Sequence, residues 1–577
     1  MENRCNDLNT IVDLLQDQTS KDKGIAMKKI FLLIILVIAG CSKKEITTGN
    51  AAAAEKVFGL NFTASERDSL LDGLNERLGQ YEQLRTIDLP NHIGYPLYYN
   101  PLVDDGNMPR GRDRFQFTEI PTVRPKDLEQ CAFMTIPELA YLIRTQKIKS
   151  EELTRMYLER LKRYGPKLEC VVMITETLAI QQARKADLEI ARGRYRGPLH
   201  GIPWGAKDLL AVPEYKTTWG AAPYKDQILD GKATVVQKLE EAGSVLVAKL
   251  TLGALAWGDV WFGGKTRNPW NTEQGSSGSS AGPGSATAAG LVGFSIGSET
   301  WGSIVSPATR NGVTGLRPSF GAVSRAGAMA LSWSMDKLGP MTRSVEGAAI
   351  VFNTIRGADA IDRTVMDVPF QYPSKRGLKN LRVGYINSAF ADSVVSENDQ
   401  AVLAVLESLG LELVPIELPE FPTRALSFVL QAEAAAAFDE LTRTNRDNEL
   451  VRQIKNAWPN VFREARFIPA VEYINANRAR TLLNQKMAEL MKTIDVYVVP
   501  SYFGDNLLRT NLTGHPCVVV PNGFNEKGTP TSISFIGDLY EDGNVLAVAK
   551  AYQEATDWHK QYPVSYTHLT LPTILLV

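Results

Sequence analysis

One segment concentrates the residues that could perform covalent chemistry. In residues 275–302 nearly every side chain is small, and Ser279 and Ser303 lie in and just after this run. A flexible linker has a similar composition, but linkers rarely contain an apolar stretch such as residues 288–294. Small side chains also allow close backbone approach and unusual backbone angles. We therefore expect a tightly packed loop system, with a helix end followed by a strand at residues 288–294.

The order of the motifs is informative. Residues 277–282 read Ser-Gly-Ser-Ser-Ala-Gly, and residues 297–304 read Gly-Ser-Glu-Thr-Trp-Gly-Ser-Ile. Together they resemble the signature of the amidase family, Gly-Gly-Ser-Ser-Gly-Gly-Ser followed by Gly-Thr-Asp-x-Gly-Gly-Ser-Ile, with the two serines at the family's spacing. Residues 197–208 resemble its lysine motif and residues 511–516 its C-terminal signature. The matches run in the family's order.

The resemblance implies a catalytic triad. Ser303 would be the nucleophile, Ser279 would relay a proton from a cis peptide geometry, and Lys207 would act as the base. Lysine accepts a proton only when it is neutral, and its ordinary pKa is about 10.4. We therefore expect burial to lower the pKa of Lys207. His200 and His515 are expected to hold loops.

The resemblance also implies an oxyanion hole. The backbone N–H groups of Thr300, Trp301, Gly302 and Ser303 would stabilise the charge that develops on the carbonyl oxygen. Two residues depart from the family pattern, because Trp301 replaces a glycine and Val305 stands where an arginine is common. Backbone donors survive a change of side chain, so the departure at Trp301 affects the expected shape of the pocket.

The expected reaction is hydrolysis of a carboxamide to a carboxylate and ammonia or an amine, through an acyl-enzyme on Ser303. No cofactor is expected, and no metal, since the five cysteines and five histidines show no metal-site spacing. Three alternatives stay open. Gly278-Ser279-Ser280-Ala281-Gly282 formally matches the nucleophile elbow of α/β-hydrolase esterases, with Ser280 as nucleophile, although no hydrophobic strand precedes it. The others are an amidotransferase A-like subunit that works on charged tRNA, and a catalytically altered binding lipoprotein.

The net charge of the chain indicates which class of partner to expect. The chain has 63 Lys plus Arg and 64 Asp plus Glu, a formal net charge of −1. No broad positive field exists to attract nucleic acid. We therefore expect a small-molecule amide as the partner.

A targeting signal is predicted near the start. Met27 opens a segment with Lys28 and Lys29, a short apolar run at residues 30–39, and a lipobox-like ending at Cys41. About ten apolar residues are too few for a permanent membrane helix but suit a signal peptide. We expect Cys41 to be lipidated, and the protein to be exported and anchored to a membrane in the bacterial periplasm or at the cell surface.

The remaining organisation follows from composition. We expect a non-native extension at 1–26, the lipoprotein signal at 27–41, a tether at 42–57, one amidase signature domain at 58–563 with an N-terminal helical arm, and a non-native tail at 564–577. A disulfide between Cys131 and Cys170 stays possible.

The elements that position the motifs are also predicted. Helices are expected after the caps at Thr135 and Ser150 and over much of 431–490. Short apolar runs alternate with helices, which favours an α/β fold, and the family resemblance implies a central mixed β-sheet covered by helices on both faces. The predicted strands are 170–174, 245–248, 381–386, 496–499 and 518–520.

Overall fold

The computed structural model describes residues 45–563, except residue 85 and residues 88–89, 94–96, 103–110 and 392–394. Cys41, the predicted lipidation site, lies outside the described residues, as do the signal segment and the tail at 564–577. The chain divides into two compact units, Met1–Asp88 and Leu89–Val577. The division comes later than the predicted domain start at residue 58.

The described part of the first unit consists of two helices. α4 spans Thr48–Phe58 and α5 spans Ala64–Leu84, so part of the predicted tether is helical. Glu55 and Arg67 join the two helices through an ion pair of 2.8 Å, and Glu55 is nearly buried. α5 lies in the region where an N-terminal helical arm was predicted.

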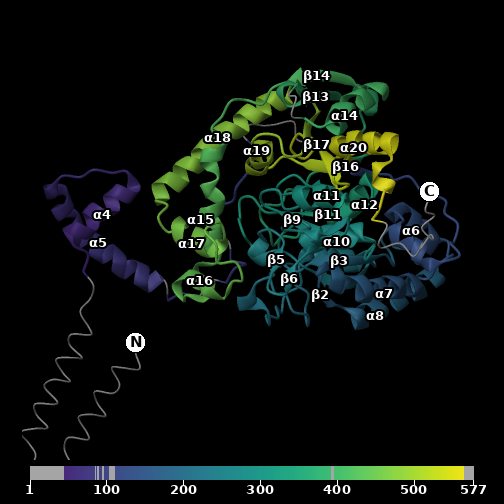
Figure 1. Cartoon of the computed structure of the whole chain (residues 1–577), viewed down its shortest axis with the longest axis horizontal. Helices are drawn as coiled ribbons and strands as arrows, with labels where there is room; N and C mark the ends of the chain where they lie inside the picture. The colour runs from purple at the N-terminus through teal and green to yellow at the C-terminus, as the bar shows by residue number, and fades with distance from the viewer. Residues whose placement is uncertain are drawn as a thin grey trace, which may run out of the picture. The chain divides into compact units, whose positions relative to one another are not determined.

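The second unit is built on an 11-stranded mixed sheet (Figure 1). Its order is β14-β13-β15-β17-β16-β10-β11-β9-β3-β4-β2. The pairs β3–β4, β3–β9, β13–β14 and β13–β15 are parallel and the others antiparallel. The strands are β2 (Val171–Ile174), β3 (Pro203–Lys207), β4 (Val245–Leu250), β9 (Phe294–Glu299), β10 (Thr314–Arg317), β11 (Lys337–Thr342), β13 (Arg382–Ile386), β14 (Glu412–Ile416), β15 (Val496–Pro500), β16 (Cys517–Phe524) and β17 (Pro530–Gly537).

Three two-stranded pairs lie outside this sheet. They are β1 (Arg114–Phe115) with β12 (Gln371–Tyr372), β5 (Val260–Trp261) with β6 (Gly264–Lys265), and β7 (Arg267–Asn268) with β8 (Asn271–Gly275). All five strands predicted from apolar runs are present in the large sheet. Continuous apolar runs suit these strands because both faces of the sheet are covered.

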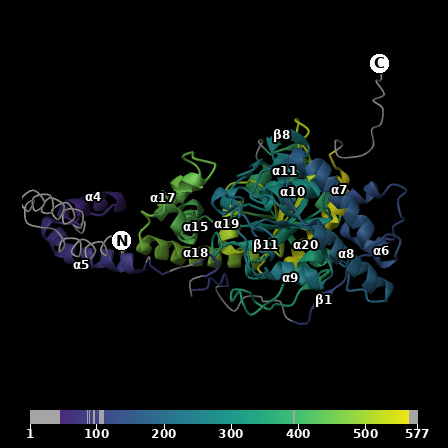
Figure 2. The same ribbon diagram turned by 90° about the horizontal axis from the view of Figure 1, so that it is seen from below.

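Helices cover both faces of the sheet, which confirms the predicted fold class. The α-helices of the second unit are α6 (Ile136–Arg144), α7 (Ser150–Leu168), α8 (Glu176–Ala191), α9 (Thr234–Glu241), α10 (Ala281–Ala288), α11 (Val305–Asn311), α12 (Val345–Ile355), α13 (Asn387–Ala391), α14 (Glu397–Ser408), α15 (Phe428–Ala437), α16 (Asp439–Arg443), α17 (Trp458–Ala465), α18 (Ala470–Met491), α19 (Asn506–Thr513) and α20 (Asp542–Thr556). In Figure 2, α10 and α11 lie toward the top of the view and α9 toward the bottom.

Short 3₁₀ helices connect several of these elements. They are Leu128–Phe133, Ala222–Tyr224, Ala254–Ala256, Leu378–Asn380, Thr423–Leu426, Arg446–Glu449 and Trp558–Lys560. The stretch 431–490, predicted to be helical, is divided among α15 to α18. Pro459 lies in the first turn of α17 and Pro469 caps α18. Proline lacks the N–H that a continuing helix needs, so it begins these helices rather than extending the preceding ones.

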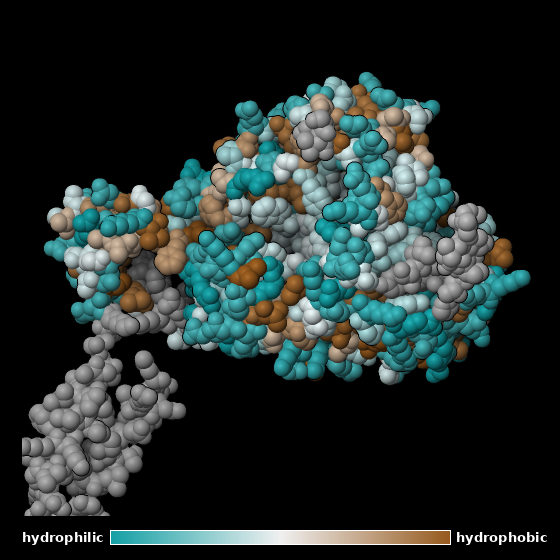
Figure 3. All heavy atoms as spheres, viewed as in Figure 1, coloured by the Kyte–Doolittle hydropathy of each residue, from teal (hydrophilic) through white to brown (hydrophobic). Residues whose placement is uncertain are grey.

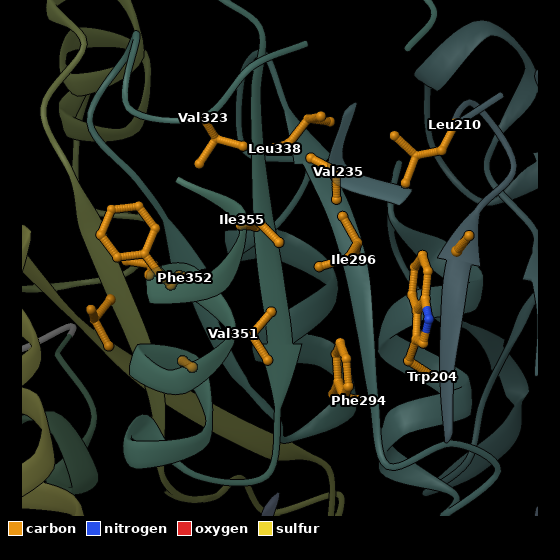
Figure 4. Packing of buried hydrophobic residues seen from close by; sticks show 14 of the residues in the cluster. Trp204, Leu210, Val235, Phe294, Ile296, Val323, Leu338, Val351, Phe352 and Ile355 are labelled. Carbon is orange, nitrogen blue, oxygen red and sulfur yellow. The ribbon is translucent and has the colours of Figure 1, made fainter. Parts of the chain in front are cut away.

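Alternate side chains of β16 enter different cores. In β16, Val518 and Val520 belong to the largest core cluster, whereas Cys517 and Val519 belong to the second. Figure 4 shows part of the largest cluster, where Trp204 of β3 and Phe294 of β9 pack side by side.

The two cysteines considered for a disulfide are buried free thiols in the structure. Cys131 lies in the largest cluster and Cys170 in a third cluster that is lined by α7 and β4. The possible Cys131–Cys170 disulfide is therefore not formed. Each thiol instead packs as a small apolar side chain.

The described helices are amphipathic or mixed in character rather than uniformly apolar. None of them is both long and apolar enough to cross a membrane. On the face of the second unit shown in Figure 3, hydrophilic side chains predominate and hydrophobic ones are scattered among them.

Two buried arginines hold the C-terminal end of α10. Arg160 of α7 donates to the carbonyl oxygens of Ala289 and Gly290 at 2.9 and 2.7 Å, and it pairs with Glu129 at 3.0 Å. Arg343 donates to the carbonyl oxygen of Thr287. The last carbonyls of a helix have no intrahelical partner, and a cation is favourable there. The helix that begins directly after Ser280 is thus fixed at its far end.

We expect Arg160→Met to lower the free energy of unfolding by about 3 kcal/mol, because it leaves buried carbonyl oxygens without donors. Arg155→Met on the same helix is the matched control. Arg155 is paired with Glu151 at 2.6 Å but is largely exposed, so its loss should cost less than about 1 kcal/mol. Urea denaturation measures both values, and equal losses in the two variants would contradict the capping role of Arg160.

Candidate active site

The three predicted catalytic residues lie at the ends of neighbouring elements. Lys207 is the last residue of β3, Ser279 comes just before α10, and Ser303 lies between β9 and α11. β3 and β9 are parallel neighbours, so their carboxyl ends meet at the same edge of the sheet. Ligands of open α/β sheets bind outside this edge.

The Lys207 amine is fully buried among serine groups. Its Nζ lies 2.9 Å from Ser279 Oγ, 3.0 Å from Ser280 Oγ and 2.8 Å from Ser298 Oγ. The Ser298 carbonyl oxygen is 3.4 Å away. Within the part of the chain that the structure describes, no carboxylate forms an ion pair with Lys207.

Burial lowers the pKa of Lys207 well below its ordinary value. The charges of Asp336 and Glu299 oppose this shift but are outweighed by desolvation. An amine that loses its hydration without gaining a directly paired anion favours the uncharged form. Burial therefore favours the uncharged amine of Lys207, which is the form that can accept a proton.

The hydrogen bonds around the amine distinguish the two adjacent serines. Ser280 Oγ donates to the Ser298 carbonyl oxygen at 3.0 Å and accepts from the Ser298 N–H at 3.1 Å. A neutral amine has two N–H donors and one lone pair, and Ser280 Oγ and Ser298 Oγ can accept those two hydrogens. The lone pair is then left for the proton of Ser279 Oγ.

The loop that carries Ser279 is packed against another backbone segment. The Gly278–Ser279 peptide is cis, as the family resemblance implied. A β-carbon at Gly278 would lie 1.8 Å from the carbonyl oxygen of Gly258, so only glycine fits there. The N–H of Ser280 donates to the carbonyl oxygen of Ser303 at 3.0 Å. This bond joins the cis-serine loop directly to the segment of the nucleophile candidate.

Several non-glycine residues with left-handed backbone conformations surround this loop. Trp219, Leu255, Ala256 and Ser277 have φ between 50° and 62°. The backbone of Trp219 connects two of the segments, because its N–H donates to the Asp208 carbonyl oxygen at 3.1 Å and its carbonyl oxygen accepts from Leu255 at 2.9 Å. Such conformations cost about 1 kcal/mol or more each and cluster at functional sites.

The turn Thr300–Ser303 presents backbone donors beside the candidate nucleophile. Among the described residues, no acceptor is hydrogen-bonded to the N–H groups of Trp301, Gly302 or Ser303. Gly302 has φ of 88°, which a side chain would oppose. The Gly302 carbonyl oxygen accepts from Ser306 at 2.8 Å, which fixes the turn onto the start of α11. Free N–H groups converging in a turn can bind an anionic oxygen.

The buried carboxylate of Glu299 holds the C-terminal end of this turn. Glu299 Oε2 accepts the N–H groups of Ile304 and Val305 at 2.7 and 2.9 Å. Its Oε1 accepts from Arg317 and from Asn511, each at 2.8 Å. Burial tends to raise the pKa of Glu299, but the Arg317 charge and these hydrogen bonds outweigh it and hold the pKa below its usual range. Glu299 is therefore a buried anion that caps α11.

A second carboxylate holds the other end of the turn. Thr300 Oγ1 donates to Asp336 Oδ1 at 2.5 Å. Asp336 Oδ2 accepts the N–H groups of Leu331 and Ser332 at 2.8 and 2.9 Å. The turn is thus tied to the segment before β11 as well as to α11.

The structure brings Lys207 and Ser279 into direct contact. The segment of Ser303 is joined to them because the Ser303 carbonyl oxygen accepts from the N–H of Ser280, the residue after Ser279. The structure has no hydrogen bond between the Ser279 and Ser303 hydroxyls, as far as the described residues go. His200 is buried and accepts from the Arg196 N–H at 3.1 Å, and His515 is buried against Thr513 Oγ1 at 2.8 Å. These bonds are made within the loops that carry the two histidines, which agrees with their expected role in holding loops.

Sequence reasoning missed the residues that support the triad. Ser298 and Glu299 stand inside a recognised motif, but their partners, Arg317 among them, are set by packing across the sheet. The bond between Asp336 and Thr300 likewise links segments that no spacing rule connects. No grouping of His, Cys, Asp or Glu suited to a metal ion occurs in the described ranges.

The chain is similar to known amidases and related proteins along most of its length. The family model described as Amidase matches residues 152–508. The glutamyl-tRNA(Gln) amidotransferase A subunit of Coxiella burnetii is 31% identical over 74% of this chain and 99% of its own. The peptide amidase of Stenotrophomonas maltophilia is 29% identical with a TM-score of 0.66, covering 74% of this chain and 98% of its own. An amidase family protein from Bacillus anthracis is 26% identical with the same TM-score, over 75% and 93%.

We expect Arg317→Met to lower the free energy of unfolding by about 3–5 kcal/mol, because it leaves the buried Glu299 charge without its cation. Adding Glu299→Gln should recover part of that loss by removing the unpaired charge. Chemical denaturation of the two single variants and the double variant measures this coupling. Additive losses would show that the pair does not act as a unit.

Proposed function

The chain belongs to the amidase family, and from this premise we propose that it hydrolyses a carboxamide C–N bond to a carboxylate and ammonia or an amine. The observation that carries the proposal is the contact of 2.9 Å between the buried Lys207 amine and Ser279 Oγ. An uncharged lysine beside a serine hydroxyl is an activated proton acceptor, which is what a serine nucleophile needs.

Attack on the amide begins with two linked proton transfers. Ser303 Oγ bonds to the carbonyl carbon and gives its proton to Ser279 Oγ, which passes its own proton to Lys207 Nζ. The carbonyl oxygen becomes an oxyanion and accepts hydrogen bonds from the N–H groups of the turn Thr300–Ser303. The mechanism requires the Ser279 and Ser303 hydroxyls to come within hydrogen-bonding distance on substrate binding, as catalytic hydrogen bonds often tighten in the complex.

Breakdown returns the proton to the leaving nitrogen. The lysine proton travels back through Ser279 to the nitrogen, the C–N bond breaks, and an ester joins the acyl group to Ser303. Water then attacks the acyl carbon of this ester and gives a proton to Ser279, which passes its own proton to Lys207. The bond between the acyl carbon and Ser303 Oγ breaks, the proton returns from Lys207 through Ser279 to Ser303 Oγ, and the acid is released and ionises to the carboxylate. No step in this sequence uses a histidine.

The hydrogen bonds of Ser280 argue against the esterase-type alternative. Ser280 Oγ is fully buried and already bonded to the Ser298 backbone on both its donor and acceptor sides. The strand before it, β8, pairs with β7 in a two-stranded sheet outside the main one and reads Asn-Thr-Glu-Gln-Gly. A nucleophile elbow needs an exposed serine after a hydrophobic strand of the main sheet.

A second candidate function follows from the relatives that are named as amidotransferase components. The same chemistry would then release ammonia for transfer within a complex that works on charged tRNA. The net charge of −1 supplies no field for tRNA. Turnover of simple amides by the purified chain alone would favour the hydrolase, and activity only with partner proteins would favour the amidotransferase.

We also propose that the mature chain begins at an acylated Cys41 and is exported and held at a bacterial membrane. The proposal rests on the Lys-Lys flank, the apolar run at 30–39 and the lipobox-like ending at Cys41. Mass spectrometry of membrane-extracted protein, with Cys41→Ser as control, tests it. A soluble wild-type chain without acyl mass would exclude the anchor.

We expect the purified chain to release ammonia or an amine from members of an amide panel, and Ser303→Ala to lower kcat by at least about 10³-fold, because no other group can form the acyl-enzyme. A fluorophosphonate probe followed by peptide mass spectrometry should label Ser303. Full turnover by Ser303→Ala, or labelling at Ser280, would overturn the assignment. Binding of amides without turnover would instead support the altered binding protein.

We expect Lys207→Arg to lower the rate of hydrolysis at least about 10²-fold, because a guanidinium stays protonated and cannot accept a proton. A loss of this size is typical when general base catalysis is removed. In the wild type, log kcat/KM should rise with pH through the lowered pKa of Lys207 and then level off, since only the uncharged amine is active. A pH profile that does not fall on the acidic side while the protein stays folded would contradict this role.

A further inference from the structure

Trp301 stands out in the turn that bears the proposed oxyanion donors. Its side chain is 42% exposed, whereas Thr300 and Ser303 on either side are 5% and 8% exposed. Among the described residues, its indole takes part in no aromatic pair and no hydrogen bond that the structure records. A large apolar group without support on a catalytic turn is unusual, since the other residues of the turn are nearly buried.

The backbone that carries this indole is held in place. Thr300 Oγ1 bonds to Asp336, Glu299 caps the following residues Ile304 and Val305, and the Ser303 carbonyl oxygen accepts from Ser280 at 3.0 Å. The exposed ring is therefore mounted on a fixed turn, two residues before the nucleophile. A ligand that packs on it loses little to the ordering of the backbone.

A second exposed aromatic residue flanks the same turn. Tyr502 is 57% exposed, and its hydroxyl donates to the Ser306 carbonyl oxygen at 3.3 Å. Leu507 packs directly on the turn, because a β-carbon at Gly302 would lie 2.8 Å from its Cδ2. Tyr502 and Leu507 thus contact residues 302–306, and the exposed Trp301 belongs to the same turn as Ser303. We call these three side chains the apolar rim.

We propose that the apolar rim selects amides bearing an aromatic or other flat apolar group, with Trp301 as the main specificity-determining side chain. This inference rests on the proposed amidase function and adds the substrate class. An indole offers a broad apolar face, and one favourable ring contact changes affinity by up to about tenfold. A ring on the acyl group and a ring on the leaving amine would both lie near Ser303, so the experiment compares the two positions.

The experiment compares acetamide, benzamide and acetanilide with the purified full chain. Benzamide carries its ring on the acyl group and acetanilide on the leaving amine. We expect the wild type to prefer at least one aromatic amide over acetamide in kcat/KM. Trp301→Ala should reduce that preference about tenfold, mainly by raising KM, because the ring contact is made in both ground state and transition state. The ratio between substrates removes any loss common to all of them.

Matched variants separate the ring from the turn. Trp301→Phe should keep most of the preference and Tyr502→Ala should lower it, whereas Leu188→Ala, which removes an exposed apolar side chain from α8, should leave it unchanged. In the Ser303→Ala background, calorimetry should show weaker binding of the preferred aromatic amide once Trp301→Ala is added, without any need for turnover.

Three results would overturn the proposal. They are an equal loss on all three amides in Trp301→Ala, a gain on the aromatic amides, which would make Trp301 an obstruction, and a wild type that hydrolyses acetamide without any aromatic preference. The last result would leave the proposed amidase function intact. A wild type that hydrolyses no amide but binds aromatic ones through Trp301 would instead contradict the function and keep the role of the rim.

Discussion

The site depends on one buried amine, that of Lys207, which has no directly paired anion among the residues that the structure describes. Lys207 lies at the end of β3 with three serine hydroxyls within 3.0 Å of its Nζ and with no exposed surface. A charged amine in this setting would lose its hydration and gain only neutral oxygens, so the uncharged form is favoured. The neutral amine in turn has enough donors to be fixed by Ser280 and Ser298 and one lone pair for Ser279. Desolvation thus prepares both the protonation state and the orientation of the base.

The contrast with Lys249 shows how neighbours decide the use of a buried lysine. Lys249 lies on the adjacent strand β4, is equally buried, and pairs with Asp208 at 2.7 Å. Burial lowers the pKa of Lys249, but the Asp208 charge opposes the shift directly. The charges of Asp336 and Glu299 act on the pKa of Lys207 from a longer distance, without a direct ion pair. Those two carboxylates instead direct their hydrogen bonds to the turn Thr300–Ser303 and the residues around it.

The turn Thr300–Ser303 is therefore held by charged groups as well as by packing. Glu299 is balanced by Arg317 and caps α11, and Asp336 is bound by Thr300 and by two backbone N–H groups. None of these bonds uses the N–H groups of Trp301, Gly302 or Ser303. The common family arginine is missing at Val305, and the buried cation beside Glu299 comes from β10, in the form of Arg317. A rigid turn of this kind can carry an exposed indole without losing its own geometry.

The sequence by itself determined the family and the class of fold, and it predicted the catalytic residues. Motif order and spacing predicted Lys207, Ser279 and Ser303, and apolar runs predicted five strands of the sheet, because both signals are local in the chain. Only the tertiary structure distinguished the two adjacent serines, because both hydroxyls lie close to the amine but that of Ser280 is bonded to the Ser298 backbone. It also decided that Arg317 and Asn511 balance Glu299, that Cys131 and Cys170 belong to separate cores, and that the region 431–490 breaks into several helices. These outcomes depend on contacts between segments far apart in the chain, whose distances are set by how the strands pair and how the helices pack on them.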